Sequence, residues 1–300
     1  MLESLPTWSS LPVNLLANHS VATAEGPSLR WRSPRAVRTV EKSSAAAAKG
    51  LVLFYISLIV LIPLAALLTN AFNHGVGSFW NAATSTESLD ALRLTVTCSL
   101  LAAAFNALAG TATAFVLVRD RFWGKSALNA IIDLPFALPT VVAGVTFYTL
   151  YGPHSPFHVN ITGSWIGITV AIMFVTLPFS VRAVQPVLES LSGDAEAAAS
   201  TLGASSFYVF RTITLPAILP ALLTGTGLAF ARALGEYGSV VFISNNLPYR
   251  SEVGSSYIYS LVSSGQVSSA ASVALILLTG ALLVLVASNV IARRLARRRG

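Results

Sequence analysis

The sequence predicts an all-α integral membrane protein with six transmembrane helices. Apolar residues make up 54% of its 300 residues and charged residues only 10%, whereas an average soluble domain carries roughly 25% charged residues. Six apolar stretches approach the ~20 residues that a helix needs to cross a bilayer. These long uniform runs lack the alternation of barrel strands, so helices are expected. The composition therefore argues against a soluble enzyme.

The six stretches differ in their charges and prolines. The first contains no charged residue, the third contains Pro135 and Pro139, and the fifth contains Arg232 and Glu236. In chain order the expected spans are residues 51–68, 94–118, 134–151, 163–181, 216–243 and 267–292. Together they define an expected membrane domain over residues 50–292.

The basic residues predict the orientation of the spans. The net charge of +7 would suggest a nucleic-acid partner in a soluble protein. Here, if the N-terminus is cytoplasmic, every Lys and Arg except Arg93, Arg232 and Arg250 falls in the cytoplasm. Because cytoplasmic loops are enriched in Lys and Arg, both termini are predicted to be cytoplasmic. Membrane topology thus accounts for the charge, and no nucleic-acid partner is expected. The external loops are then residues 73–91, 152–162 and 244–266.

Both ends of the chain are predicted to be basic tails. Residues 1–49 are rich in Ser, Pro, Ala and Arg, and we expect a disordered cytoplasmic segment that touches anionic lipid headgroups. A plastid transit peptide is the alternative, although Glu3, Glu25 and Glu41 argue against it. Residues 293–300 form the basic cytoplasmic C-terminal tail.

Catalytic and metal-binding patterns are absent from the sequence. The segment 123–126 resembles the end of a phosphate-binding loop, but Arg119 stands where that motif requires its first glycine. The single cysteine, Cys98, cannot form an intrachain disulfide. His154 and His158 lack a third ligand for a metal. We therefore expect no cofactor, no metal and no ATP hydrolysis by this chain.

The loop between the fourth and fifth expected spans has a pattern of its own. Residues 195–202 are strong helix formers, and Asp194 is a candidate N-cap. Gly203 then allows a left-handed turn. A short amphipathic stretch follows over residues 206–213, and Leu215-Pro216 ends it and begins the next span. The pattern predicts two short helices joined at Gly203, with a small alanine-rich face that suits a groove on another protein.

This loop resembles the EAA motif of ABC importer permeases: Glu-Ala-Ala, three residues, Gly, nine residues, Ile, one residue and Leu-Pro. From Gly203 onward the match is complete. The motif places its glutamate at position 197, where this chain has Ala197; Glu196 lies one residue early, about 100° around a helix. The resemblance implies that the loop couples the permease to an ATPase through Glu196, Ala197, Ala198, Gly203, Ile213, Leu215 and Pro216.

Segments 133–140, 231–242 and 248–253 resemble the sulfate/thiosulfate permease subfamily, and molybdate or tungstate permeases are the near alternative. The resemblance implies a type I importer fold in a bacterial inner membrane. It also implies two ATPase subunits, a second similar or identical permease subunit and an extracytoplasmic sulfate-binding protein.

Two further features stay open at this level. Arg232 and Glu236 are four residues apart in the fifth expected span, and would share one helix face. They form either a structural ion pair or, through Arg232, part of the anion's path; if Glu236 carried protons, an ion-coupled secondary transporter would be the alternative. Residues 252–266 predict a short helix at the external mouth, as a docking surface or an aromatic anchor.

Overall fold

The computed structural model describes residues 48–297, which contain helices and no strand. The chain divides into two compact units, residues 1–60 and 61–300. The described part of the first unit, residues 48–60, is helical and passes into a π-helical turn at Ser57–Leu61. The predicted disordered tail covered residues 1–49, of which residues 1–47 lie outside the described residues. Residues 48 and 49 are helical, so the tail was predicted two residues too long.

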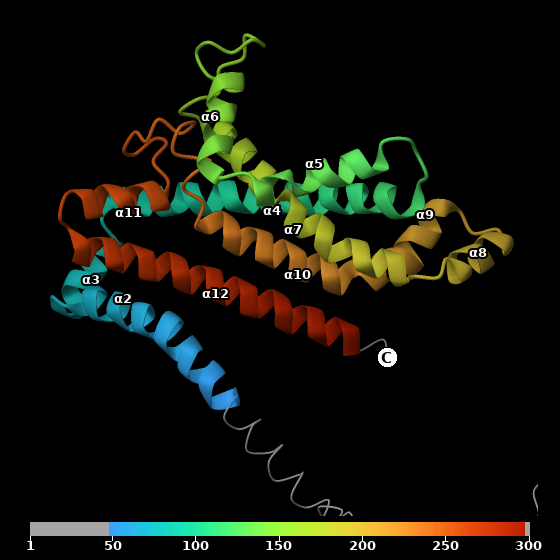
Figure 1. The fold of residues 1–300 in the computed structure, drawn as a ribbon, viewed down its shortest axis with the longest axis horizontal. Coiled ribbons are helices and arrows are strands. Elements are labelled where there is room, and N and C mark those ends of the chain that lie inside the picture. The colour runs from blue at the N-terminus through green and yellow to red at the C-terminus, as the bar shows by residue number, and fades with distance from the viewer. Residues whose placement is uncertain (1–47, 298–300) are drawn as a thin grey trace, which may run out of the picture. The chain divides into compact units, whose positions relative to one another are not determined.

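The second unit is a bundle of long helices with shorter ones at their ends (Figure 1). The long helices are α4 (Thr86–Arg119), α7 (Trp165–Ser190), α10 (Leu215–Leu234) and α12 (Val267–Arg297). The others are α2 (Ile62–Phe72), α3 (Gly75–Ala83), α5 (Lys125–Ala137), α6 (Thr140–Tyr151), α8 (Asp194–Thr201), α9 (Ser206–Val209) and α11 (Gly254–Ser263).

Helices α4, α7 and α10 pack against one another, and α12 packs on α10. Small residues permit this approach: a Cβ at Gly225 of α10 would lie 2.5 Å from the Cβ of Ala183 on α7, as is usual where helices associate in membranes. Asn106 of α4 donates to the carbonyl of Met173 and to Thr176 Oγ1, both at 2.9 Å. These two hydrogen bonds satisfy the side-chain amide of Asn106, which is buried.

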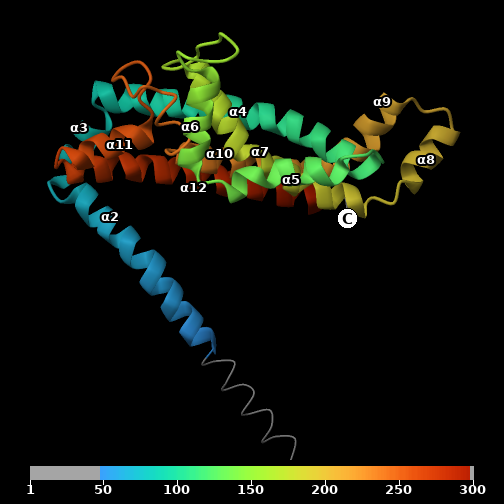
Figure 2. The ribbon, with the colours of Figure 1, turned by 45° about the horizontal axis from the view of Figure 1, so that its top comes forward.

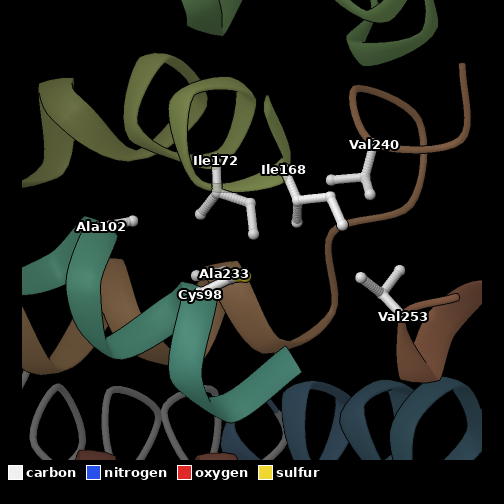
Figure 3. Close-up of a cluster of buried hydrophobic side chains, with 7 residues drawn as sticks. All are labelled: Cys98, Ala102, Ile168, Ile172, Ala233, Val240 and Val253. Atoms are coloured by element: carbon white, nitrogen blue, oxygen red, sulfur yellow. The ribbon is translucent and has the colours of Figure 1, made fainter. Parts of the chain in front are cut away.

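One core cluster joins these helices to the segment that follows α10. Figure 3 shows Cys98 and Ala102 of α4 facing Ile168 and Ile172 of α7, with Val240 and Val253 from beyond α10 closing the cluster. The cluster fixes the chain between residues 235 and 253 against the bundle.

The expectation of six spans holds when a bent helix pair is counted as one. Among residues 48–297, five helices are long and apolar enough to cross a membrane, and α5 with α6 supplies a sixth. The five are Ala48–Phe72, Thr86–Arg119, Trp165–Ser190, Ser206–Leu234 and Val267–Arg297.

The prediction of one continuous third span was wrong. Helices α5 and α6 meet at a bend of 111°, and Leu138 between them has extended backbone (φ −83°, ψ 134°). Pro139 is the cause, because a proline disfavours helical geometry in the residue before it. Pro135 remains inside α5.

The predicted start of the fifth span agrees with α10, which begins at Leu215, but the predicted end near residue 243 was wrong, since α10 ends at Leu234. The helical run continues back from α10 to Ser206 without a break at Pro216. The turn before it, Phe210–Thr214, is π-helical, and the Leu215 N–H bonds to the carbonyl of Phe210, five residues back. This wider turn admits the proline. Beyond Leu234, residues 235–253 form turns.

Candidate functional site

The segment between α7 and α10 forms two short helices, as predicted. Helix α8 spans Asp194–Thr201 and α9 spans Ser206–Val209, and both lie at one end of the bundle (Figures 1 and 2). The predicted N-cap was off by one residue: Gly193, in a left-handed conformation, holds that position, and Asp194 is the first helical residue. We call residues 194–209 the α8–α9 element.

Gly203 makes the turn between these two helices. Its φ is +85°, a conformation that favours glycine. The Gly203 N–H bonds to the carbonyl of Ser200 at 3.0 Å, and the Ala204 N–H bonds to that of Ala199 at 3.1 Å. These two bonds satisfy carbonyls at the end of α8, so the turn is compact and hydrogen-bonded.

Apolar side chains on the α8–α9 element point away from the bundle. Leu202 is 89% exposed and Phe207 is 72% exposed, and Tyr208, Ala197 and Ala198 are also exposed. Large apolar residues grouped on a surface mark interaction sites. We call these five residues and Gly203 the exposed face of the element.

Glu196 lies off this face and bonds within the chain. Its Oε2 is 3.0 Å from Nη2 of Arg119, at the end of α4. Its Oε1 accepts a hydrogen bond from Thr214 Oγ1 at 2.6 Å. The offset of one residue from the family position therefore turns the carboxylate towards the bundle. Glu196 joins α8 to the ends of two long helices.

The last three residues of the predicted coupling loop pack inward. Ile213, Leu215 and Pro216 are half-buried, and Leu215 packs against the core cluster that contains Leu117 and Leu188. The predicted coupling residues thus fall into two groups. Ala197, Ala198 and Gly203 are exposed. Glu196, Ile213, Leu215 and Pro216 anchor the element to the bundle.

Arg232 and Glu236 form an ion pair across the end of α10. Arg232 Nη1 is 2.6 Å from Glu236 Oε2; the Glu236 side chain is 1% exposed and that of Arg232 is 37% exposed. The expectation that both lie on one helix was wrong, since α10 ends at Leu234. Glu236 Oε1 accepts the Ser239 N–H at 2.9 Å, and its carbonyl accepts from Ser255 Oγ at 2.6 Å. Glu236 therefore holds the turns after α10 in place.

Gly235 and Gly238 lie beside this ion pair in the sequence. Of the two, Gly238 packs closely against α6. A Cβ there would overlap Thr140 Oγ1 and lie 2.9 Å from the Val141 nitrogen, both of α6. A Cβ at Gly144 of α6 would lie 2.6 Å from the Gly238 carbonyl oxygen. At Gly235, a Cβ would meet no described atom within 4 Å.

Sequence reasoning missed a polar cluster around Arg182. The sequence placed Arg182 only as a cytoplasmic flank, but it lies inside α7 and bonds to Asp133 and Asn129 of α5. The sequence did carry a signal for this cluster: Asp133 and Arg182 are opposite charges, each in an otherwise apolar stretch. We call Arg182, Asp133, Asn129 and Gln185 the Arg182 cluster.

A cavity of about 460 Å³ lies between the start of α4, the start of α7 and residues 249–252. The Tyr249 hydroxyl donates to Glu87. Burial raises the pKa of Glu252 above its ordinary value; a hydrogen bond with Ser260 opposes the shift, and the charge of Glu87 adds to it. The charged lining residues are Glu87, Asp90, Arg93, Arg250 and Glu252. Three of these five side chains are carboxylates, which repel a dianion, so the cavity is a poor site for one.

No metal-binding group was found among residues 48–297.

The chain matches the family described as the binding-protein-dependent transport system inner membrane component over residues 106–298. The chain belongs to this family. Among the curated members, it is 38% identical to the sulfate transport system permease protein CysT of Salmonella typhimurium over 256 residues, which cover 83% of this chain and 92% of that one.

Other relatives agree with this membership. The CysT protein of Synechocystis is 38% identical and covers 80% of this chain and 86% of its own length. The probable cysT protein of Nephroselmis olivacea is 36% identical, with 85% and 92% covered.

Solved structures of importers share the fold. A bacterial ABC transporter that imports alginate matches with a TM-score of 0.71 at 19% identity, covering 87% of this chain and 99% of that chain. The methionine ABC transporter in an inward-facing form matches with a TM-score of 0.55 at 16% identity, covering 70% and 96%. The chain is thus an integral membrane permease with the type I importer fold.

Proposed function

We propose that the chain is the membrane-spanning permease subunit of an ATP-driven importer for sulfate. The observation that carries the proposal is the α8–α9 element. Its apolar face lies outside the long helices, and Glu196 and Leu215 attach it to them. Such a surface fits a cleft on a separate ATPase. The substrate is proposed from the relatives named as sulfate transport permeases.

In this proposal the permease itself is not catalytic. Two ATPase subunits dock on the α8–α9 elements of two permease subunits, which are similar or identical, and an extracytoplasmic binding protein delivers the anion. Closure of the ATPases moves the elements together and reorients the spans by rigid-body motion. Because the element is short, hydrogen-bonded and anchored, it transmits the displacement instead of absorbing it.

Transport by the reconstituted complex tests this function. Proteoliposomes that contain the permease, its ATPase subunits and the binding protein should take up radiolabelled sulfate only when ATP is supplied inside. Uptake should persist after an ionophore collapses the ion gradients, because the coupling is to ATP. Excess thiosulfate or molybdate measures selectivity. Uptake that follows an ion gradient without ATP would favour a secondary transporter, and uptake of molybdate alone would favour the near alternative.

The proposal places the chain in an inner membrane with both termini cytoplasmic, and cysteine labelling tests this orientation. Cys98 is buried, so a cysteine added at an exposed position should dominate the signal. In intact cells, His158→Cys should react with an impermeant maleimide. Trp123→Cys, at a residue that is 100% exposed, should react only after permeabilisation. The reverse pattern would contradict the orientation.

A further inference from the structure

The guanidinium of Arg182 uses all five of its N–H donors within the protein. Nε and Nη2 donate to the two carboxylate oxygens of Asp133 at 2.8 and 2.6 Å. Nη1 donates to Asn129 Oδ1 at 3.1 Å and to Gln185 Oε1 at 2.5 Å. The second Nη2 donor reaches the Asn129 carbonyl at 3.3 Å. A bidentate pair of this kind fixes the relative orientation of the two side chains. Because all five N–H donors of Arg182 are used, none is left to bind an anion.

This cluster lies away from the ends of both helices. Asp133 is eight residues from the start of α5 at Lys125, and Arg182 is eight residues from the end of α7 at Ser190. At 1.5 Å per residue, both lie about 12 Å inside their helices. The Asp133 side chain is 49% exposed and that of Arg182 is 31% exposed. Charged side chains within apolar helices face a partner or water in preference to lipid, and here Arg182 and Asp133 are each other's partners.

Helices α5 and α6 have different attachments. Helix α5 is bonded to α7 through the Arg182 cluster, and α7 leads into α8 after residues 191–193. Helix α6 packs closely on the turns after α10, where Gly144 and Gly238 meet, and touches α7 through the aromatic pair Phe147–Phe174. Between them is the 111° bend. Helix α5 is thus held to α7 by charged hydrogen bonds, whereas α6 is held by an aromatic contact with α7 and by close backbone packing on the turns after α10.

We propose that the Arg182 cluster holds α5 to α7 as one rigid body that moves with the α8–α9 element, and that residues 138–139 are the hinge against α6. Asp133 and Arg182 are positioning residues for the transport cycle. Their role in transport rests on the proposed function, whereas the rigid attachment of α5 to α7 does not.

Distances between spin labels test the attachment directly. One label pair, Ser126→Cys with Glu189→Cys, reports on α5 and α7; a second, Ser126→Cys with Thr149→Cys, reports on α5 and α6. In nanodiscs, the α5–α7 distance distribution should be narrow, and Asp133→Asn should broaden it. In the complex with its ATPase subunits, trapping the ATP-bound state should shift the α5–α6 distance and leave the α5–α7 distance unchanged.

The variant Arg182→Lys separates rigid attachment from simple charge neutralisation. Lysine keeps the positive charge but cannot make the bidentate pair, so it should broaden the α5–α7 distribution as Asp133→Asn does. It should also lower sulfate uptake per ATP hydrolysed by roughly 2- to 30-fold, as for residues that couple two elements. Arg293→Lys, on α12, is the matched control and should change neither measurement.

An unchanged α5–α7 distribution in both Asp133→Asn and Arg182→Lys would overturn the proposal, as would an α5–α7 distance that shifts with ATP in the unmodified chain. These outcomes are read from distances alone. A complex that carries no sulfate while the distances behave as expected would refute the sulfate function and leave the attachment in place.

Discussion

Replacing Gly203 with valine should uncouple ATP hydrolysis from sulfate uptake while the spans remain inserted. Gly203 has φ +85°, and a Cβ built there meets no described atom within 4 Å. The penalty is therefore backbone strain alone, about 1–2 kcal/mol for a residue other than glycine. Strain of this size lowers the population of the native turn by about 5- to 30-fold, and the angle between α8 and α9 changes. We expect uptake to fall by a similar factor, with hydrolysis retained.

The chain offers a matched control for this substitution. Gly265, in the turn between α11 and α12, has φ +79° and equally open surroundings among the described residues. Gly265→Val imposes the same backbone strain far along the chain from the α8–α9 element and should leave the ratio of uptake to hydrolysis intact. Gly203→Asn should be milder, because asparagine tolerates this conformation. If Gly203→Val leaves uptake and hydrolysis unchanged in proteoliposomes, the α8–α9 element is not the coupling element.

Replacing Arg232 with glutamine should destabilise the permease strongly. The change leaves the carboxylate of Glu236, which is 1% exposed, without its opposite charge. Breaking a buried pair costs about 3–5 kcal/mol; because Arg232 is itself 37% exposed, we expect the lower end of that range. Thermal unfolding in detergent and the yield of monodisperse protein on size exclusion should both fall.

The double variant Arg232→Gln/Glu236→Gln separates the two roles left open for Arg232. A neutral glutamine at 236 can still accept the Ser239 N–H, and no buried charge remains, so folding should recover. Sulfate uptake by this double variant then decides the question. A folded protein that transports sulfate normally would make the pair structural, whereas a folded protein without uptake would show that the charges of the pair act in transport. Persistent instability would show that the charges themselves hold the turns after α10.

The features that the sequence predicted well depend on neighbouring residues. The α8–α9 element follows from an alanine-rich run, one glycine and a short amphipathic stretch, which are consecutive in the chain. Spans follow from local apolar content in the same way. The break of the third span was also signalled locally, by Pro139, but the angle of 111° depends on what α6 packs against.

The features that the sequence could not predict depend on distant partners. Glu196 pairs with Arg119 and Thr214, and Arg182 pairs with Asp133, 49 residues earlier. Periodicity cannot supply such pairings, because it describes one element at a time. The end of α10 was missed for the same reason: residues 235–243 are apolar enough for a helix, but Glu236 bonds instead to Ser239 in the turns and to Ser255 of α11.

The contact between Gly144 and Gly238 has a consequence for the order in which the protein is made. The two residues are separated by the whole of α7, the α8–α9 element and α10. Synthesis at 5–20 residues per second puts roughly 5–20 seconds between the emergence of α6 from the ribosome and that of its packing surface. During that interval Gly144 of α6 has no Gly238 to pack against. The surface around Gly144 must then be covered by lipid or by the insertion machinery until residues 235–253 are synthesised.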